Sequence, residues 1–413
     1  MSAVENGADR IRCLPANIRD KAPDPEPSPP DGGFTTPVSY PFVAPGAKER
    51  VMKAISEGTI SSATKVVREF EDELRAYFRV PLAKACNSGY SALVLALQLG
   101  RIGPGDDVLI PTLTMAAVAN AVLTAKANPI TVDCAKGEFN PSLAEYERQI
   151  TPKTRALIVT HTYGVPADCP KLQIFCKRKG LIFIEDIAEA IGAECNGKPV
   201  GTFGDFACAS LYANKAITAG DGGFVLSTRT DPDLFDRANS YANHGFTKDF
   251  HFVHFEPSGN YKMSGLQAAL VTPAIALIPH VMEDRSRIAQ VYRSELDGVA
   301  GLELMPMNPY GNDAPWVFAI LVESKQMRTK VRQKLADERI ETRDFFFPLH
   351  LQPFLHEVNP LRQLKSLPNS EDLGSRGFYL PTFYNLPDKE IKRISQCIKD
   401  ALKKELINHC VRI

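Results

Sequence analysis

Residues Ala156–Asp186, "ALIVTHTYGVPADCPKLQIFCKRKGLIFIED", decide the fold class of this chain. Two short apolar runs, 156–164 and 180–186, read as strands, and 169–179 between them reads as a helix. Strands that alternate with helices and are apolar along their whole length are typical of a parallel sheet covered on both faces. In such sheets, ligands bind beyond the carboxyl ends of the strands.

The same alternation extends outward on both sides of this unit. Strands are predicted at 107–111 and 128–133, with a helix at 114–126 between them. Upstream, helical spacing of apolar residues predicts helices at 46–58, 64–78 and 90–100. Downstream, 264–296 reads as a long helical stretch that Pro273 and Pro279 bend or split. A strand at 315–324 and helices at 326–338 and 391–406 then indicate a smaller α+β domain.

Three parts of the chain are therefore expected. Residues 1–35 contain the proline-rich, acidic run "APDPEPSPPDGG" and are predicted to be a disordered leader. Residues 36–280 form the large domain with the parallel sheet, and residues 281–413 form the small C-terminal domain.

Composition and charge exclude several classes of protein. The 413 residues carry no net charge, which argues against a nucleic-acid partner or a membrane surface. No apolar run approaches the length of a membrane span, and the first residues lack the apolar segment of a secretory signal. The nine cysteines are scattered without a CxxC pair, which argues against a zinc site or a disulfide framework. We expect a cytoplasmic protein without a metal.

Lys215 stands alone in "SLYANKAITAGDGGFVLS", residues 210–227, with no acidic residue within five positions on either side. A lysine that forms a Schiff base must lose its proton part of the time, so it needs a partly desolvated site without a carboxylate partner next to it in the chain. The plain alternative is a solvated surface lysine.

Asp186 ends the apolar run "GLIFIED" and so lies at the carboxyl end of a predicted buried strand. A carboxylate there can pair with a protonated pyridine nitrogen and strengthen pyridoxal phosphate as an electron sink. Alternatively, Asp186 or Glu185 caps a helix in the segment that follows.

A small polar turn precedes the apolar helix in "CNSGYSALVLAL", residues 86–97. Free backbone N–H groups at a helix N-terminus suit a phosphate. The alternative is ordinary capping by Ser88 or Ser91. Ser210 offers a further phosphate hydroxyl if the segment before Lys215 turns back.

The order of these parts resembles the DegT/DnrJ/EryC1/StrS family, whose members are fold-type I sugar aminotransferases that depend on pyridoxal phosphate. The resemblance runs from about residue 37 to the C-terminus. Its most specific block is "FIEDIAEAIGAECNGKPVGTFGDFACASLYANKAITAGDGG", residues 183–223, with further blocks at 57–78, 87–97, 108–122, 160–168, 243–245, 259–270 and 343–353. It implies a mixed, mostly parallel seven-stranded sheet between helices, with the small α+β domain after it.

The resemblance also implies roles for single residues. Lys215 would hold the cofactor covalently and shuttle the proton, Asp186 would pair with the ring nitrogen, and Glu189 would lie beside the ring hydroxyl. The remaining cofactor residues are implied to be Gly89, Tyr90, Met115, Ser210 and Asn260, the last reaching the phosphate of the neighbouring subunit of a homodimer. The substrate residues are implied to be Ser61, Ser62, His244, Arg343, Phe347, Pro348 and His350.

The sequence departs from the family pattern at four positions. Met115 stands in place of an aromatic residue that stacks on the pyridine ring, and a thioether stacks less specifically. Tyr90 stands in place of a threonine, Lys262 of an arginine, and Asp221 of a glutamate. His161 and Tyr163, at the predicted strand end, are either site residues or structural ones.

The implied reaction is transfer of an amino group, from L-glutamate, to the keto carbon of a nucleotide-linked 4-keto-6-deoxyhexose, as in GDP-perosamine synthesis. Glu189 is the main residue behind that specific case. The alternatives are a 3-keto sugar or a dTDP- or UDP-linked sugar as acceptor, and a non-catalytic relative that regulates or scaffolds.

Overall fold

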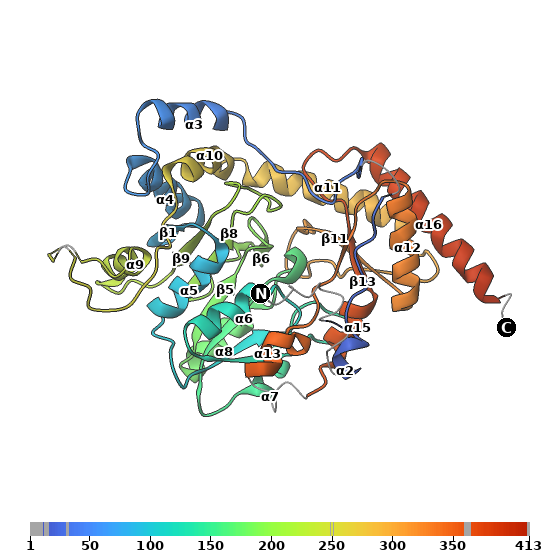
Figure 1. The fold of residues 1–413 in the computed structure, drawn as a ribbon, viewed down its shortest axis with the longest axis horizontal. Helices are drawn as coiled ribbons and strands as arrows, with labels where there is room; N and C mark the ends of the chain where they lie inside the picture. Colours follow the sequence, from blue (N-terminus) through green and yellow to red (C-terminus); the bar gives the residue numbers. More distant parts are fainter. Residues whose placement is uncertain are drawn as a thin grey trace, which may run out of the picture.

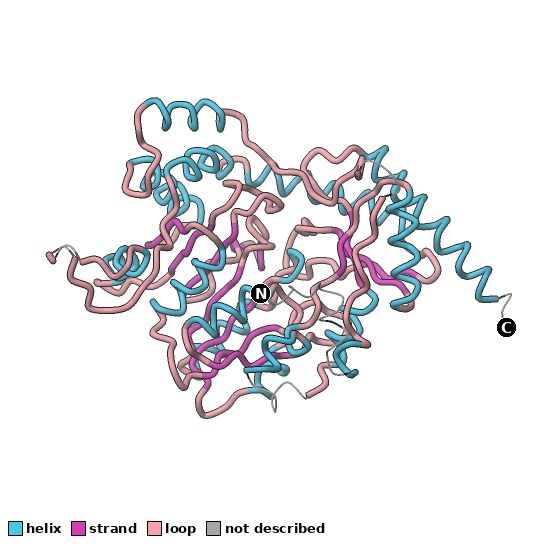
Figure 2. The backbone as a smooth tube through the Cα atoms, viewed as in Figure 1, coloured by secondary structure: helices cyan, strands magenta, loops and turns pink. Residues whose placement is uncertain are grey.

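The computed structural model describes residues 11, 16–29, 33–247, 249–250, 252–358 and 365–410. Figure 1 shows a large α/β domain on the left of the view and a smaller domain on the right, and Figure 2 shows that the strands fall into two groups accordingly.

The central sheet of the described residues has seven strands in the order β1-β9-β8-β5-β4-β2-β3. All neighbours from β8 to β3 pair in parallel, whereas β9 runs antiparallel to both β8 and β1. The predicted mixed, mostly parallel sheet is therefore confirmed. The strands are β1 (Leu82–Cys86), β2 (Asp107–Pro111), β3 (Asn128–Val132), β4 (Thr154–Val159), β5 (Ile182–Asp186), β8 (Phe206–Ser210) and β9 (Gly223–Ser227).

Both faces of this sheet are buried because alternate residues of each strand point to opposite sides. In β4, Ala156 and Ile158 pack into the apolar layer on one face, and Leu157 and Val159 into the layer on the other. The first layer contains α5 (Gly89–Leu99), α6 (Ala116–Thr124) and α9 (Leu234–Ala242). The second contains α4 (Lys65–Phe78), α7 (Leu143–Gln149), α8 (Cys169–Lys179) and α10 (Gly265–Ile275), and α3 (Ala47–Ser56) lies beside α10 (Figure 1).

The small domain is built on a four-stranded antiparallel sheet in the order β10-β11-β13-β12. Its strands are β10 (Leu302–Leu304), β11 (Phe318–Val322), β12 (Arg343–Asp344) and β13 (Gly377–Leu380). An apolar core joins this sheet to α11 (Ile278–Leu296), α12 (Lys325–Asp337), α15 (Pro368–Arg376) and α16 (Asp388–Cys410). Short elements complete the described chain: α2 (Ala16–Arg19), β6 (Glu194–Cys195), β7 (Lys198–Pro199), α13 (Pro353–Val358) and the 3-10 turns η1 (Thr162–Gly164) and η2 (Leu349–Leu351).

The strand predicted over 156–164 ends five residues early, at Val159. His161 and Tyr163 have left-handed backbone conformations, with φ of 40° and 57°, and turn the chain away from the sheet. Gly164 completes the turn at φ 90°, where a Cβ atom would lie 2.3 Å from the backbone nitrogen of Trp316. The turn thus brings the small domain's connecting segment against the strand end.

The helical stretch 264–296 is split as predicted. Pro273 lies inside α10, whereas Pro279 lies at the start of α11, where its missing N–H is no loss. Taken together the two helices have the length and apolarity of a membrane span, but they are bent by 66° from each other; within the described residues, neither helix alone meets that test. The proposed domain boundary at 280 falls inside α11, and the residues at which the domains divide stay a prediction.

Part of the expected leader packs against the small domain. Among residues 16–29, Ile18 is 1% exposed, Lys21 pairs with Glu371, and Glu26 pairs with Arg332. Asp24 accepts a hydrogen bond of 2.6 Å from Thr329. Asp24 also pairs with Lys325 and Arg328 of α12, so the expectation of a disordered leader does not hold for residues 16–29. Residues 1–10, 12–15 and 30–32 lie outside the described residues.

Deleting the residues before Gly33 tests what this segment does. We expect the melting temperature to fall by a few degrees, because one buried isoleucine and several partly exposed ion pairs are lost. Catalytic activity at low temperature should be intact, because none of these residues lines the cavity described below. A large loss of activity at a temperature where the shortened chain is folded would contradict this.

Candidate active site

A cavity of about 400 Å³ lies at the carboxyl ends of β5 and β8, between the two domains. Lys215, on the loop after β8, enters it together with Asp186, the last residue of β5, and Glu189, three residues further on. The sequence predicted these three residues as one group, and the structure brings them together. The remaining lining residues are Ser88, Gly89, Tyr90, Leu93, Thr114, Met115, Ala117, Thr160, Ala188, Ser210, Tyr212, Asn214, Asp221, Gly222, Trp316, Phe346 and Tyr379.

Two carboxyl groups in this cavity have raised pKa values. Burial raises the pKa of Asp186 to about 6 and that of Glu189 to about 7, against the attraction of Lys215. One oxygen of Asp186 accepts from the N–H of Ala188 at 3.0 Å, and one oxygen of Glu189 accepts from the N–H of Tyr163 at 2.7 Å. Neither Asp186 nor Glu185 caps a helix, because residues 188–192 form turns and no helix follows β5 directly.

The amine of Lys215 is shifted in the opposite sense. Burial lowers its pKa, the carboxylates of Glu189 and Asp186 raise it, and the guanidinium of Arg285 lowers it. An amine with a lowered pKa loses its proton more readily and is a better nucleophile at neutral pH.

The turn before α5 offers an anion site. Ser88 caps the helix by accepting from the N–H of Ser91 at 3.1 Å, so the capping interpretation is right as well. The N–H groups of Gly89 and Tyr90 have no acceptor among the described residues and lie at the positive end of the helix. A Cβ on Gly89 would lie 2.8 Å from the Cβ of Ser210, so this turn and the end of β8 form one cradle. A phosphate fits it.

The comparisons with known proteins agree with this geometry. Residues 44–399 match the DegT/DnrJ/EryC1/StrS aminotransferase family. The chain belongs to this family. It is 32% identical to GDP-perosamine synthase of Escherichia coli O157:H7 over 364 residues, which cover 88% of this chain and 98% of the relative.

Among the other similar proteins are an aminotransferase named for a UDP-linked sugar and a solved crystal structure. The chain is 34% identical to UDP-N-acetyl-3-dehydro-alpha-D-glucosamine 3-aminotransferase of Acidithiobacillus ferrooxidans over 81% of this chain and 88% of the relative. The crystal structure of DesV of S. venezuelae superposes with a TM-score of 0.79 at 29% identity, covering 86% of this chain and 93% of DesV. The chain is thus a pyridoxal-phosphate-dependent aminotransferase with the fold of that class of enzyme.

The residues of this family member fit the cofactor. When bound, pyridoxal phosphate supplies an aldehyde that takes up an amino group and a ring that accepts electrons. The N–H groups of Gly89 and Tyr90 and the hydroxyl of Ser210 would hold the phosphate, and the carboxylate of Asp186 would hold the proton of the ring nitrogen. Glu189, with its pKa of about 7, would give or take the proton of the ring hydroxyl, and the amine of Lys215 would move the proton at the substrate carbon.

Two departures from the family pattern also have a structural outcome. The Tyr90 hydroxyl lies 2.6 Å from the Thr124 hydroxyl on α6, so this side chain joins α5 to α6. Met115, the residue before α6, lines the cavity and is 56% exposed, so it is placed to cover one face of a bound ring.

The other predicted residues are not brought to this cavity. Arg343 pairs with Glu341 and lines a neighbouring cavity of about 400 Å³ that shares Tyr212, Asn214, Trp316 and Tyr379 with the first. His350 is buried, 2.8 Å from the Thr112 hydroxyl and 3.1 Å from Glu371. Ser61, Ser62, His244, Phe347, Pro348 and Asn260 do not line the first cavity. Their assignment stays a prediction.

Sequence reasoning missed the aromatic wall of the cavity. Phe346 was not among the predicted substrate residues of the block 343–353, yet it lines the cavity and stacks on Tyr163 at 5.2 Å between ring centroids. Trp316 was read as the start of a strand, and Tyr379 lies on β13, a strand that the sequence did not predict. No sequence motif marks these three residues. The one signal in the sequence is that they are aromatic and lie in the segments that join or form the small domain.

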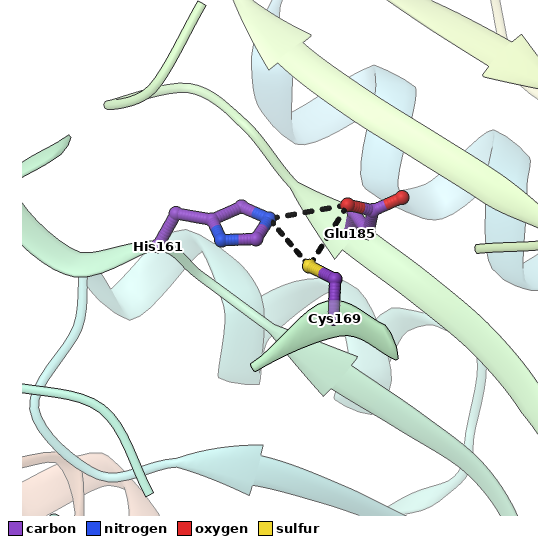
Figure 3. A group of neighbouring side chains, drawn as sticks. All are labelled: His161, Cys169 and Glu185. Atoms are coloured by element: carbon purple, nitrogen blue, oxygen red, sulfur yellow. Dashed lines mark hydrogen bonds and ion pairs between the residues drawn. The ribbon is translucent and has the colours of Figure 1, made fainter. Parts of the chain in front are cut away.

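Beneath the site, His161, Cys169 and Glu185 form the one group of three possible metal ligands found in the described part of the chain (Figure 3). His161 Nδ1 accepts from the N–H of Ala167 at 3.1 Å, so the ring proton is on Nε2, which lies 3.3 Å from Glu185. A histidine that binds a metal through Nε2 instead carries its proton on Nδ1. The protons therefore fit a hydrogen-bonded cluster, and we assign no metal to it.

The anion cradle can be tested by Gly89→Ala. The added methyl group collides with Ser210 and displaces the N–H groups that face the phosphate. We expect the affinity for pyridoxal phosphate, measured by absorbance or calorimetry, to fall about ten- to a hundredfold, the worth of one or two hydrogen bonds to a charged group. Gly103→Ala is the matched control, because no atom lies within 4 Å of its added Cβ. Equal affinities of the two variants would contradict the assignment.

The raised pKa of Glu189 predicts a pH-dependent stability of the cofactor-free protein. Below pH 4.5 the group is protonated in both folded and unfolded chains, and above pH 7 it is ionised in both. Its ionisation in the folded state costs about 3 kcal/mol, so stability is lost as the pH rises from 4.5 to 7. Glu189→Gln should therefore gain stability relative to the parent over that range in thermal unfolding. A difference that does not change with pH would count against it.

Proposed function

We propose that this enzyme transfers an amino group from L-glutamate to the keto carbon of a nucleotide-linked 4-keto-6-deoxyhexose, as in GDP-perosamine synthesis. One observation carries the proposal: Lys215, Asp186 and Glu189 line one cavity, and aromatic side chains form its outer wall. Asp186 would face the ring nitrogen of the cofactor, and the pKa of Glu189 is about 7. The volume of the cavity is in the range of small-molecule sites.

The similarity to GDP-perosamine synthase favours this substrate. It extends over 98% of that relative at 32% identity, so both domains and their connection are included. Glu189, the residue that suggested this case from the sequence, lies in the cavity beside Lys215.

A UDP-linked 3-keto sugar is the second candidate. The observation in its favour is the 34% identity to the UDP-sugar 3-aminotransferase, over a somewhat shorter part of the chain. The two candidates differ in the nucleotide and in the carbon that receives the amine, so a single substrate panel separates them.

We further propose that the enzyme works as a cytoplasmic homodimer with shared active sites. Tyr90, Met115 and Tyr212 line the cavity and are 37%, 56% and 52% exposed in the single chain, and a second subunit would cover them. Asn260, which the family resemblance assigns to the phosphate of the neighbouring subunit, is exposed as well. In the described part of the chain, seven cysteines are seen as free thiols, which suits a reducing compartment.

The test is an amino-transfer assay with L-glutamate against GDP-, dTDP- and UDP-linked 4-keto and 3-keto sugars. Mass spectrometry and NMR identify the product and the carbon that bears the amine. We expect the highest kcat/KM with the GDP-linked 4-keto-6-deoxy sugar and no product with Lys215→Ala. Turnover of a UDP-linked 3-keto sugar alone would establish the second candidate. No product from any sugar, with the cofactor bound, would overturn the substrate assignment and favour a non-catalytic relative.

A further inference from the structure

The amine of Lys215 lies on the face of an indole ring. Its Nζ is 3.8 Å from the ring centroid of Trp316, within the range in which an ammonium group is attracted to an aromatic face. Among the described residues, no hydrogen bond or ion pair is made by this Nζ. The contact with the indole ring of Trp316 therefore determines the position of the Lys215 amine.

Trp316 makes three hydrogen bonds, two through its backbone and one through its indole N–H. Its backbone N–H donates to the carbonyl of Tyr163 at 3.1 Å, its carbonyl accepts from the guanidinium of Arg285, and its indole N–H donates to the carbonyl of Asn214 at 2.8 Å. The last bond is to the residue next to Lys215. The ring is thus fixed relative to both the small domain and the lysine loop.

The surroundings of the amine set the balance between its charged and neutral forms. Asp186 and Glu189 face it from the end of β5 and favour the ammonium, whereas burial and Arg285 of α11 favour the neutral amine. Asp221 and Tyr379 line the same cavity. An indole face favours the ammonium as well, because its negative quadrupole attracts a cation and not a neutral amine.

We propose that Trp316 is a positioning residue for Lys215, whose indole face holds the ε-ammonium beside the cofactor whenever the lysine is not bonded to it. The proposal rests on the cofactor and on Lys215, and is independent of which sugar is the substrate. During the transfer of an amino group the lysine is released from the cofactor and must bond to it again. A fixed resting place keeps it within reach between these two events.

Trp316 affects the pH dependence of the rate at which the amine of Lys215 bonds to the cofactor. The ammonium first loses a proton; the neutral amine then adds to the aldehyde carbon of pyridoxal phosphate, and one water leaves as the carbon–nitrogen double bond forms. Only the neutral amine reacts, so the rate rises with pH through the pKa of Lys215. Removing the indole face destabilises the ammonium and moves this midpoint to lower pH.

The experiment follows the absorbance change on adding pyridoxal phosphate to cofactor-free protein over a range of pH. In Trp316→Leu the face is lost, and we expect the midpoint of the rate profile to fall by about one pH unit, the worth of a partly desolvated cation–π contact. In Trp316→Phe a weaker face remains while the indole N–H is lost, and the midpoint should fall by less than half as much. Phe345→Leu, which removes a ring from the same aromatic cluster outside the cavity, should leave the midpoint in place.

Two outcomes would overturn the proposal. Equal shifts in Trp316→Phe and Trp316→Leu would assign the effect to the lost hydrogen bond to Asn214 rather than to the ring face. An unshifted midpoint in both would reduce Trp316 to a packing residue, even if the variants were less stable.

A second measurement needs no variant at Trp316. This residue is the single tryptophan of the chain, so intrinsic tryptophan fluorescence reports on this site alone. In the cofactor-free protein we expect the emission to change with pH at the same midpoint as the bond-forming rate, because the charge above the ring is lost there. The transition at this midpoint should be absent in Lys215→Met, where only the carboxyl groups of Asp186 and Glu189, whose pKa values are about 6 and 7 in the parent protein, would change the emission. A transition that persists in that variant at the midpoint of the bond-forming rate would overturn the proposal.

Discussion

The carboxylate of Glu185 holds together the end of the central strand on which the active site is built. It lies on β5 one residue before Asp186, so the two side chains point to opposite faces of the sheet. Its oxygens accept from the N–H groups of Gly201, Phe203 and Gly204 at 2.7–2.9 Å, and from the ring of His161. The turn after β4 and the loop before β8 are thereby joined to β5 below the cavity.

Three buried carboxyl groups near this strand end are thus sorted by their surroundings. Burial raises the pKa of all three, but in Glu185 the hydrogen bonds from His161 and from the backbone of Gly201 and Gly204 outweigh it and bring the pKa below its ordinary value. Asp186 and Glu189 accept one backbone hydrogen bond each, and their pKa values stay raised. The carboxylate with many donors joins elements below the cavity, and the two carboxyl groups with few donors face into the cavity.

The sequence predicted the elements whose pattern is set by local burial. The helix 169–179 and the strand 107–111 have the predicted bounds, because Asp168 caps the start of the helix, Gly180 ends it, and every residue of the strand is buried. β1 was not predicted, since Lys84 interrupts its apolar run; the structure pairs that lysine with Glu71 of α4 at 2.9 Å, a partner 13 positions away that no local pattern indicates. Likewise, Asp186 was predicted from its place at a strand end, Lys215 from its lack of charged neighbours in the chain, and Glu189 from the family resemblance. Trp316, Phe346 and Tyr379 reach the cavity only through the packing of the second domain.

The antiparallel strand β9 also sets the order in which the enzyme can form. β1 pairs with β9, so residues 82–86 find their neighbour only when residues 223–227 are present. The turn at Gly89 follows β1 directly, and Gly223 lies so close to it that a Cβ would be 2.5 Å from the carbonyl oxygen of Ser88. During synthesis, the ribosome must therefore deliver more than half of the chain before the phosphate cradle exists. Until then the edge of β1 is open to other chains, and a truncated product ending before β9 exposes it permanently.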